Sequence, residues 1–428
     1  MRESRGRTAE GEAGHASEAW RLIAIAAVAF VILAARRPEA IFRSEFSFES
    51  GSVFYIGTYF GSVPESLFRP YAGYQHLLPR IISFAERAVP VGLAPLASHL
   101  IVLAVLAALA AFLASDRMRT VVPSRLGRLG LAALLVLLPN VQESEGVVGD
   151  IQRYIPIYLL ALGLAAKPRR VWAQRAELGF LAVIALSGPA AVLMQPLFWW
   201  RAWRDRDGYS RAIVAIFALA TVIQLVSIVI DGRNAANLAD PVNLVRVWIF
   251  RMVVGEFLGQ TISFQAVTAG LPIWVGIVTT ILLGAILVRL WWKALGPSVR
   301  VCVAYIWIVF AVTPILAQTE GVGLLSGPGA ANRYVLVPTA MTAIVVFAAF
   351  ARLRRRPDRL IAVIAAVTFA IGIGGDLRLP ALPEQGWAHN SGCIGGTAAC
   401  VVPVYEPGDW SIVWPGKYGT WVQPRPGG

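Results

Sequence analysis

The chain is predicted to be an all-α polytopic membrane protein with about eleven transmembrane helices, in a range of about nine to thirteen. Two observations predict this fold class. Apolar residues make up 57% of the 428 residues and charged residues only 15%, a balance outside that of ordinary soluble domains. Apolar runs close to the length of about 20 residues that a bilayer core requires recur along the chain, and clusters of basic residues separate them.

The predicted spans follow these apolar runs. Their approximate bounds are 20–35, 93–114, 129–139, 154–166, 177–187, 189–200, 211–230, 271–292, 299–316, 333–351 and 359–374. Several of them are short for a bilayer core. The fifth and sixth meet at Ser187-Gly188-Pro189 and are expected either as a hairpin or as one broken helix, because Gly and Pro interrupt helices.

The charges predict the orientation of the spans. With the N-terminus in the cytoplasm, 23 of the 38 basic residues fall in inner segments, 14 in outer segments and Arg21 in the first span. The 25 acidic residues divide into 9 inside and 16 outside. This positive-inside bias predicts a cytoplasmic N-terminus and an outer C-terminus. It also accounts for the net charge of +13, so the expected partner is the lipid bilayer and not nucleic acid.

Two outer segments are predicted to form interfacial helices. In the fourth outer loop, residues 241–260 are largely apolar but carry two arginines and a glutamate, and a crossing there would move later basic clusters outside. In the first outer loop, apolar residues recur at helical spacing over 77–89. We expect that helix to lie along the membrane surface, with Arg80 near the level of the lipid headgroups.

Composition divides the chain into three regions: a cytoplasmic N-terminal tail (1–19), a transmembrane body (20–374) with its outer loop 36–92, and an outer-face C-terminal tail (375–428). The C-terminal tail is rich in Gly, Pro and Trp and holds Cys393 and Cys400. Oxidation is expected on the outer face, so these two cysteines are predicted to form a disulfide. No metal site is expected there, because His389 alone lies near them.

The first outer loop carries two acidic residues just beyond the first span. Glu45 and Glu49 are candidate catalytic bases, because a carboxylate there can accept a proton from an attacking hydroxyl. The flexible pair Ser50-Gly51 follows Glu49 and allows close approach of a substrate. The alternative is that both carboxylates are solvated loop residues.

Further candidate substrate-binding residues follow in the same loop: Arg69, Tyr71, Tyr74, His76 and Arg80. Arginine binds phosphate oxygens in a bidentate fashion. His76 is expected to donate a hydrogen bond to a phosphate or to position an acceptor; a purely structural histidine is the alternative.

Later outer loops contribute another set of candidates. Glu143, Glu145 and Asp150 lie in the second outer loop and contribute a carboxylate to the same cleft, or coordinate a divalent cation, or only oppose the inner positive charge. Arg333 and Tyr334 stand at the mouth of a span, where an arginine either holds a lipid phosphate or simply reaches the interface. A cation such as Mg²⁺ is compatible with these acids, but nothing in the sequence demands one.

Several segments, in order along the chain, resemble elements of bacterial membrane glycosyltransferases with the type C (GT-C) architecture. The segment Phe48-Glu49-Ser50-Gly51-Ser52-Val53-Phe54 is similar to their acidic element after the first span. The other similar segments are Pro70 to Tyr74 with His76 to Arg80, Pro139-Asn140 with Glu143 or Glu145 and Gly149 to Gln152, Arg333-Tyr334 with Pro338, and Cys400 to Pro407 with Trp410.

The resemblance implies transfer of a sugar from a polyprenyl-phosphate carrier to an envelope glycan, lipid or protein acceptor, at the outer face of a bacterial inner membrane. In such enzymes an acid of the first outer loop acts as base, and Glu49 matches that acid. Arg80 and Arg333 would stabilise the phosphate leaving group. Ser50 stands where the family has an aspartate, and a serine without an activator is no base at neutral pH.

Three interpretations therefore stay open. The first is a GT-C-type glycosyltransferase that transfers a hexose or a pentose. The second is a transporter or flippase for a glycolipid or another envelope precursor, which would use the same arginines without chemistry. The third is a non-catalytic scaffold derived from the GT-C fold. The near absence of acids within the clear spans favours the enzyme over a proton-coupled carrier.

Overall fold

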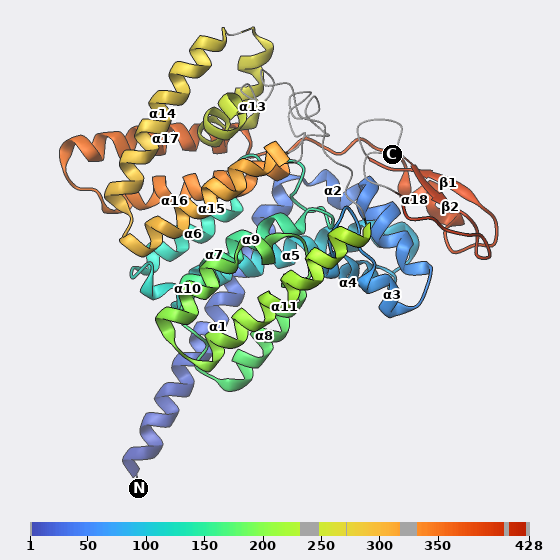
Figure 1. Cartoon of the computed structure of the whole chain (residues 1–428), viewed down its shortest axis with the longest axis horizontal. Helices are drawn as coiled ribbons and strands as arrows, with labels where there is room; N and C mark the ends of the chain where they lie inside the picture. Colours follow the sequence, from blue (N-terminus) through green and yellow to red (C-terminus); the bar gives the residue numbers. More distant parts are fainter. Residues whose placement is uncertain (1, 232–247, 271, 317–331, 406–410, 425–428) are drawn as a thin grey trace.

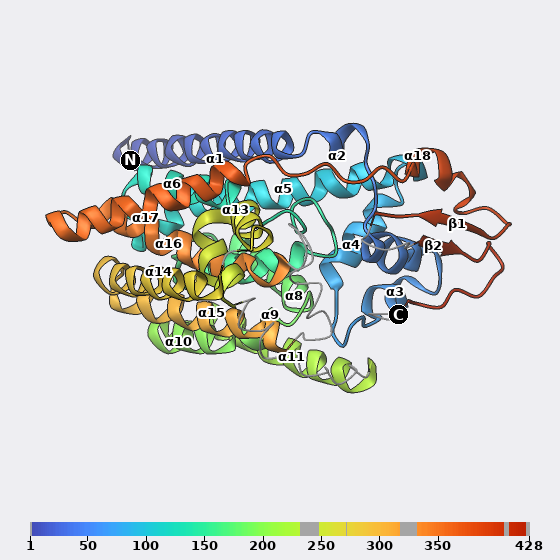
Figure 2. The same cartoon turned by 90° about the horizontal axis from the view of Figure 1, so that it is seen from above.

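The computed structural model describes residues 2–231, 248–270, 272–316, 332–405 and 411–424 of the chain. These residues are mostly helical. The view in Figure 1 shows a body of helices and a small sheet, β1 and β2, set to one side of it. Turned by 90°, the helices run side by side, with the N-terminus at one end of the body and the hairpin at the other (Figure 2).

The first half of the chain contains the helices α1 (Arg2–Arg36), α2 (Glu39–Phe42), α3 (Val63–Phe68), α4 (Leu77–Glu86), α5 (Ala94–Ala114), α6 (Arg125–Val136), α7 (Ile155–Leu164), α8 (Val171–Ala185), α9 (Ala190–Leu193), α10 (Gln195–Asp205) and α11 (Gly208–Asp231). A π-helical segment, η1, spans Glu49–Tyr55. Short 3-10 turns are η2 (Ile56–Tyr59), η3 (Val91–Leu93), η4 (Asp116–Thr120) and η5 (Ile151–Tyr154).

The second half contains a further π-helical segment, η6 (Trp248–Val254), and the helices α13 (Gly255–Thr268), α14 (Ile273–Ala294), α15 (Pro297–Leu316), α16 (Leu336–Arg352), α17 (Arg356–Gly375) and α18 (Trp387–Asn390). Two short turns are η9 (Asn332–Tyr334) and η10 (Ser391–Cys393). The strands β1 (Cys400–Pro403) and β2 (Ser411–Trp414) pair antiparallel, with Cys400 opposite Trp414 and Pro403 opposite Ser411.

Five helical segments of the described residues are long and apolar enough to cross a membrane: Glu18–Arg36, Val91–Ala114, Gly208–Asp231, Trp274–Ala294 and Arg356–Gly375. Three shorter apolar segments accompany them: Ile151–Leu164, Pro297–Val312 and Leu336–Arg352. The polytopic membrane character predicted from the sequence is therefore supported. The number of spans found is smaller than the eleven that the sequence predicts.

The predicted spans 177–187 and 189–200 do not form two long helices. α8 starts early, at Val171, and ends at Ala185; the next segment is divided at Met194 into α9 and α10. Gly188 has φ of 101°, a conformation that favours glycine and breaks the helical path. The polar ends of α8 and α10 explain why neither meets the length of an apolar span.

The predicted interfacial segment 241–260 is described from residue 248 onward; the rest of it lies outside the described residues. η6 and α13 form this part, and it is not among the candidate spans. α13 is broken at Gly259, where φ is 74°. Asp376, at the end of α17, accepts hydrogen bonds at the break from the backbone N–H groups of Gln260 (2.9 Å) and Thr261 (3.2 Å).

The helix predicted in the first outer loop is α4, and its polar side chains face the interior of the protein. Arg80, Ser83 and Glu86 are buried, whereas Ile81 is exposed. Arg80 is therefore not the headgroup-level residue that the sequence predicts. The polar side chains are buried because α4 packs on η1 and on η2, so protein covers the face that was expected to meet water.

The C-terminal tail forms a small second core with the first outer loop. Trp387 is fully buried against Phe46 and Tyr55, and Val402 and Ile412 complete this core. This core is separate from the larger cluster of buried apolar residues in the helical body, and a small third cluster contains Val53, Phe54 and Tyr71. The tail is therefore packed on the loop and is not an independent extension.

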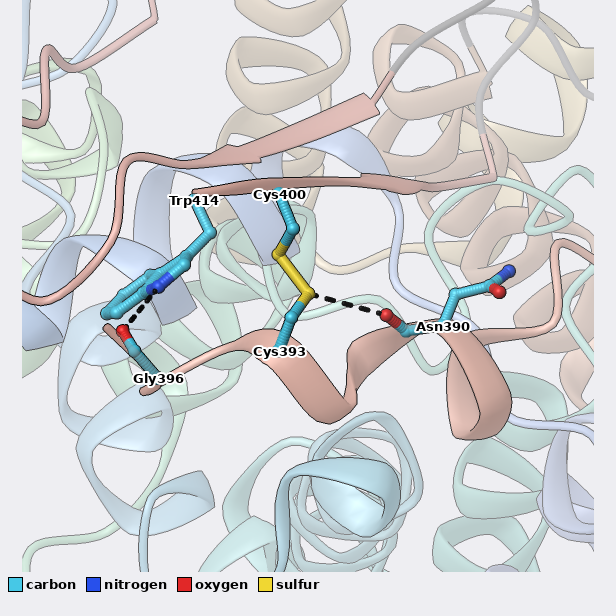
Figure 3. Close-up of a disulfide and its surroundings, with 5 residues drawn as sticks. All are labelled: Asn390, Cys393, Gly396, Cys400 and Trp414. Carbon is cyan, nitrogen blue, oxygen red and sulfur yellow. Dashed lines mark hydrogen bonds between the residues drawn. A yellow bond between two sulfur atoms is a disulfide. The ribbon is translucent and has the colours of Figure 1, made fainter. Parts of the chain in front are cut away.

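A disulfide closes the start of this tail. Cys393 and Cys400 are joined in the structure, as Figure 3 shows. The indole Nε1 of Trp414 donates a hydrogen bond to the carbonyl of Gly396, 3.1 Å away, within the loop that the disulfide closes. The bond fixes β1 to the turn before it, which supports the short strand pair.

Glu86 gives the fold a predicted pH dependence. Its carboxyl group is buried and makes no hydrogen bond of normal geometry among the described residues. Burial raises its pKa from the ordinary 4.5 to about 8, with the Ser98 and Ser83 hydroxyls opposing the shift. Because the folded pKa lies above the unfolded one, this contribution to stability is complete below about pH 4.5 and is lost as the pH rises through about 8.

Glu86→Gln is therefore expected to flatten the pH dependence of the thermal unfolding midpoint between pH 5 and 9, and to raise the midpoint at the alkaline end. The measurement is thermal unfolding of the purified protein at a series of pH values. Glu384→Gln, at an exposed acid, is the matched control and should leave the wild-type curve unchanged. An unaltered curve for Glu86→Gln would contradict the assignment.

Candidate functional site

The first outer loop does not lie on the surface of the helical body but enters it. The backbone N–H of Gln75 donates to Gln224 Oε1 of α11 (2.8 Å), and its side-chain amide donates to Ser227 (2.8 Å). Leu77 and Leu78 are hydrogen-bonded to Leu186 and Ser187, at the break after α8. Polar residues of α11 and the backbone at the break after α8 thus both bind this loop.

Glu49 opens the π-helical segment η1 that the loop positions. Its Oε1 accepts a hydrogen bond from the Tyr71 hydroxyl at 3.3 Å. Its Oε2 faces Gly149 of the second outer loop so closely that a Cβ there would lie 3.4 Å from it. A π-helix is wider than an α-helix and is often found at functional sites, because it re-aims one side chain out of register.

Ser50 joins the two loops beside Glu49. Its buried hydroxyl accepts a hydrogen bond from the backbone N–H of Gly149 (3.3 Å) and lies 2.8 Å from the hydroxyl of Ser47. Gly51 is needed next to it, since a Cβ there would overlap Ile412 of β2. In this arrangement Ser50 positions Glu49 against the second loop and has no base of its own within these contacts.

The electrostatic surroundings of Glu49 come from three parts of the chain. Burial raises the pKa of its carboxyl group above the ordinary range. Arg333 and Arg153 lower it again, Asp150 adds to the rise, and the Tyr71 hydrogen bond lowers it. The carboxylate is therefore within electrostatic reach of two arginines that are 180 residues apart in sequence.

Arg153 and Arg333 both lie close to the ring of Tyr334. The guanidinium carbon of each lies 5.6 Å from the ring centre of Tyr334. Arg153 Nε approaches Asp150 Oδ1 at 3.4 Å, and Arg333 Nη1 approaches Glu143 Oε1 at 3.4 Å. Among the described residues, each arginine thus has a carboxylate partner at a long distance, and both arginines are only partly buried.

A recess opens beside this pair of arginines. It has a volume of about 50 Å³, and its polar wall is formed by Gln152, Arg153, Arg333 and Tyr334. Its apolar wall comes from residues of α7, α9, α15 and α16 and from the segments before them: Pro156, Pro189, Ala190, Leu193, Phe310 and Val337. With cations at one side and apolar side chains at the other, a recess of this volume suits an anionic group such as a phosphate and is smaller than the sites that enclose whole ligands.

His76 is buried beside Glu49's partner Tyr71. Its Nε2 lies 3.0 Å from the Tyr71 carbonyl, and its ring stacks on Tyr74 with centroids 4.4 Å apart. Burial, with the charge of Arg80, lowers its pKa to about 3, so the ring is neutral at physiological pH. With the Nε2 proton donated to the Tyr71 carbonyl, Nδ1 is an acceptor, so in this arrangement the ring has no donor left for a phosphate. Its expected role in positioning an acceptor stays a prediction.

Arg80 lies near His76, but its guanidinium contacts the C-terminal tail. Its guanidinium lies over the ring of Phe54 at 5.5 Å, and its Nη2 donates to Gln423 Oε1 at 3.3 Å. Burial lowers its pKa to about 10, with Arg69 contributing. Arg69 is paired with Glu65 (2.6 Å) and contacts Trp421, so it belongs to the contact between loop and tail.

Two predicted acids are engaged elsewhere. Glu45 Oε1 accepts hydrogen bonds from the backbone N–H groups of Gln385, Gly386 and Trp387 at the start of α18. Glu145 is buried and paired with Arg36 at 2.6 Å, and burial raises its pKa to about 7 although the nearby arginines lower it. Both carboxylates have structural partners, so neither is available as the base that Glu49 can be.

The structure thus brings together eight of the predicted site residues, from three outer segments: Glu49, Tyr71, Tyr74, His76, Glu143, Asp150, Arg333 and Tyr334. Arg153 was not among the predicted site residues. Its spacing of three from Asp150 and its place at the mouth of a span, which it shares with Arg333, are the signals that could have identified it.

Within the described part of the chain, no group of three or more His, Cys, Asp and Glu side chains is arranged to hold a metal ion. The acids nearest to the site, Asp150 and Glu143, each face an arginine. The cationic side chains that act on the Glu49 carboxyl group are the guanidinium groups of Arg333 and Arg153.

No protein-family model matches the chain, and no curated protein matches it.

Proposed function

We propose that the chain is an integral membrane glycosyltransferase of the GT-C type, which moves a sugar from a polyprenyl-phosphate carrier to an envelope acceptor. The observation that carries the proposal is the assembly of one partly buried carboxylate, Glu49, with two arginines beside an amphiphilic recess. A base next to an anion-binding pair is what displacement of a phosphate from an anomeric carbon requires.

The proposal includes the topology. The N-terminus lies in the cytoplasm of a bacterial cell, about eleven segments cross the inner membrane, and the C-terminal tail lies outside. The short helices α6, α8 and α10 count as spans in this topology because basic residues follow or precede them. The site then lies at the outer face, together with the three outer loops that build it.

The proposed reaction is a direct displacement at the anomeric carbon. Glu49 accepts the proton of an acceptor hydroxyl as the oxygen attacks the anomeric carbon, and the bond from that carbon to the phosphate oxygen breaks. The electron pair leaves with the phosphate, whose added charge Arg153 and Arg333 stabilise. The glycoside forms with inverted configuration, and the proton on Glu49 is then lost to water. The neutral His76 donates from Nε2 to the Tyr71 carbonyl and leaves Nδ1 as an acceptor in the wall of the site.

The test is a transfer assay with the purified protein in nanodiscs, offered a panel of polyprenyl-phosphate sugars and envelope extracts as acceptors. Mass spectrometry should detect a glycosylated product and free polyprenyl phosphate in equal amounts. A deletion strain should lose the same glycan and regain it on complementation. Movement of the lipid-linked sugar across the bilayer without release of polyprenyl phosphate would refute the proposal.

Arg333→Gln is expected to lower kcat by about 10²–10³-fold, because a preorganised donor to the leaving group is removed. Its effect on KM should be smaller, since Arg153 still holds the ground-state phosphate. Steady-state kinetics with a defined donor measure both. Arg378→Gln, whose pair with Glu39 lies at an exposed surface, is the control and should retain wild-type kcat. Equal losses in the two variants would remove Arg333 from the site.

One observation favours the second candidate, a proton-coupled transporter. Glu256 of α13 is buried between α15 and α16, where it accepts hydrogen bonds from Trp307 and Thr342. Acids buried among membrane helices are typical of proton-coupled carriers. Glu256→Gln discriminates the two functions, because it should leave sugar transfer unchanged and would abolish proton-coupled transport.

A further inference from the structure

A second cavity lies between α6, α7, α15 and α16, away from the candidate site. Its volume is about 310 Å³, and its walls are almost entirely apolar. The wall on α16 runs from Ala340 to Arg352, which at 1.5 Å per residue is about 18 Å. A space of this shape, long and parallel to the helices, fits a hydrocarbon chain better than a compact ligand.

One end of this cavity is basic. Arg352 lines it at the end of α16, and its guanidinium donates to the carbonyls of Val121 and Ala294, each at 3.1 Å. These bonds use two of the five N–H groups, and the side chain is exposed. The neighbouring basic residues of the same end are Arg119, Arg125, Arg354, Arg355 and Arg356.

The basic mouth is distinct from the arginines of the candidate site. Arg333 stands just before α16 and Arg352 at its end, and 17 residues of helix, or about 25 Å, separate them. A headgroup held by Arg352 therefore cannot be the phosphate held by Arg333. The two ends of α16 present two separate positions for anionic groups.

We propose that this cavity binds an anionic phospholipid, with one acyl chain in the apolar slot and the phosphate against Arg352. Charge complementarity identifies the headgroup class, because basic pockets between membrane helices attract acidic lipids and each nearby cation contributes to the attraction. The small side chains of Ala343 and Ala348 leave room for the chain. This site is independent of the proposed sugar transfer.

The test is native mass spectrometry of the purified protein, titrated with phosphatidylglycerol and, separately, with phosphatidylcholine. One phosphatidylglycerol should bind more tightly than any phosphatidylcholine. Arg352→Gln should weaken phosphatidylglycerol binding about fivefold, which corresponds to about 1 kcal/mol. Arg352→Lys, which keeps the cation, should retain most of the affinity. Arg354→Gln removes a neighbouring exposed arginine that does not line the cavity and should weaken binding less than Arg352→Gln does.

A second variant tests the slot itself. Ala343→Phe places a ring in the cavity and should abolish specific binding of both lipids, while Val367→Phe, at an exposed position of α17, should not. Gel filtration verifies that each variant is folded. Equal affinity for the two lipids, or equal losses in Arg352→Gln and Arg354→Gln, would overturn the proposal. Displacement of the bound lipid by polyprenyl phosphate would assign the cavity to the carrier and would overturn it as well.

Discussion

Replacing Glu49 by glutamine is expected to lower sugar transfer by about 10²–10⁴-fold, the range for loss of a general base. The amide keeps the size of the side chain and can still meet the Tyr71 hydroxyl and Gly149, so the loop should remain in place. What disappears is the proton acceptor. The measurement is the initial rate of product formation in nanodiscs at saturating donor, with the amount of inserted protein determined in parallel.

Glu65→Gln is the matched control for this prediction. Glu65 lies in the same loop, is exposed and pairs with Arg69 at the surface. Its loss should cost little, because exposed ion pairs contribute on the order of 1 kcal/mol or less to stability. Wild-type rates of sugar transfer in both variants would rule out Glu49 as the base and would assign that role to another group.

The pH dependence provides a further check on the same residue. Burial raises the pKa of Glu49, and the base must be ionised to act. The plot of kcat/KM against pH should therefore have a rising limb, whose apparent pKa lies above the ordinary glutamate value of about 4.3. The limb should vanish in Glu49→Gln. A limb that persists in this variant would belong to another group.

Arg36→Met is expected to destabilise the folded protein by about 3–5 kcal/mol, independently of function. The Arg36 guanidinium is buried at the end of α1, pairs with Glu145 at 2.6 Å, and donates to four carbonyls from the ends of α6 and α17. Methionine fills a similar volume but leaves the Glu145 carboxylate buried without its cation. The midpoint of thermal unfolding in nanodiscs is the measurement.

Two variants delimit this effect. Arg43→Met removes an arginine whose pair with Glu384 is largely exposed, and it should change the unfolding midpoint little. The double variant Arg36→Met with Glu145→Met should recover part of the lost stability, because no charge is then left buried and alone. A double variant as unstable as the sum of the single ones would show that the carbonyl contacts, and not the ion pair, carry the energy.

The long apolar helices could be predicted from the sequence because a run of about 20 apolar residues has few alternatives to a membrane-crossing helix. The predicted span 211–230 corresponds to α11, and 93–114 to α5. The arrangement of α8 to α10 could not be predicted. Its cause is the insertion of Gln75 and its neighbours between α8 and α11, a contact between segments about 150 residues apart that no local pattern encodes.

For the site, residue chemistry and position in the outer loops were enough to nominate Glu49, Tyr71 and Arg333 as neighbours. The partners of Glu45 and Glu145 could not be foreseen, because a carboxylate that caps a tail helix or pairs with Arg36 has the same sequence signal as a solvated one. Burial of Arg80 was missed for a similar reason: amphipathic spacing identifies a helix but not what covers its polar face.

The tail that covers the first loop has a consequence for biosynthesis. Glu45 and Gly51, which flank Glu49, rest on Gly386 and Ile412, and Arg80 meets Gln423. The first loop is synthesised well before Gly386, Ile412 and Gln423, and it can adopt this form only after they have been made. A polypeptide released before the tail is made would insert its spans but lack the contacts that shape the first loop. We therefore expect only products that include the tail to have the site around Glu49.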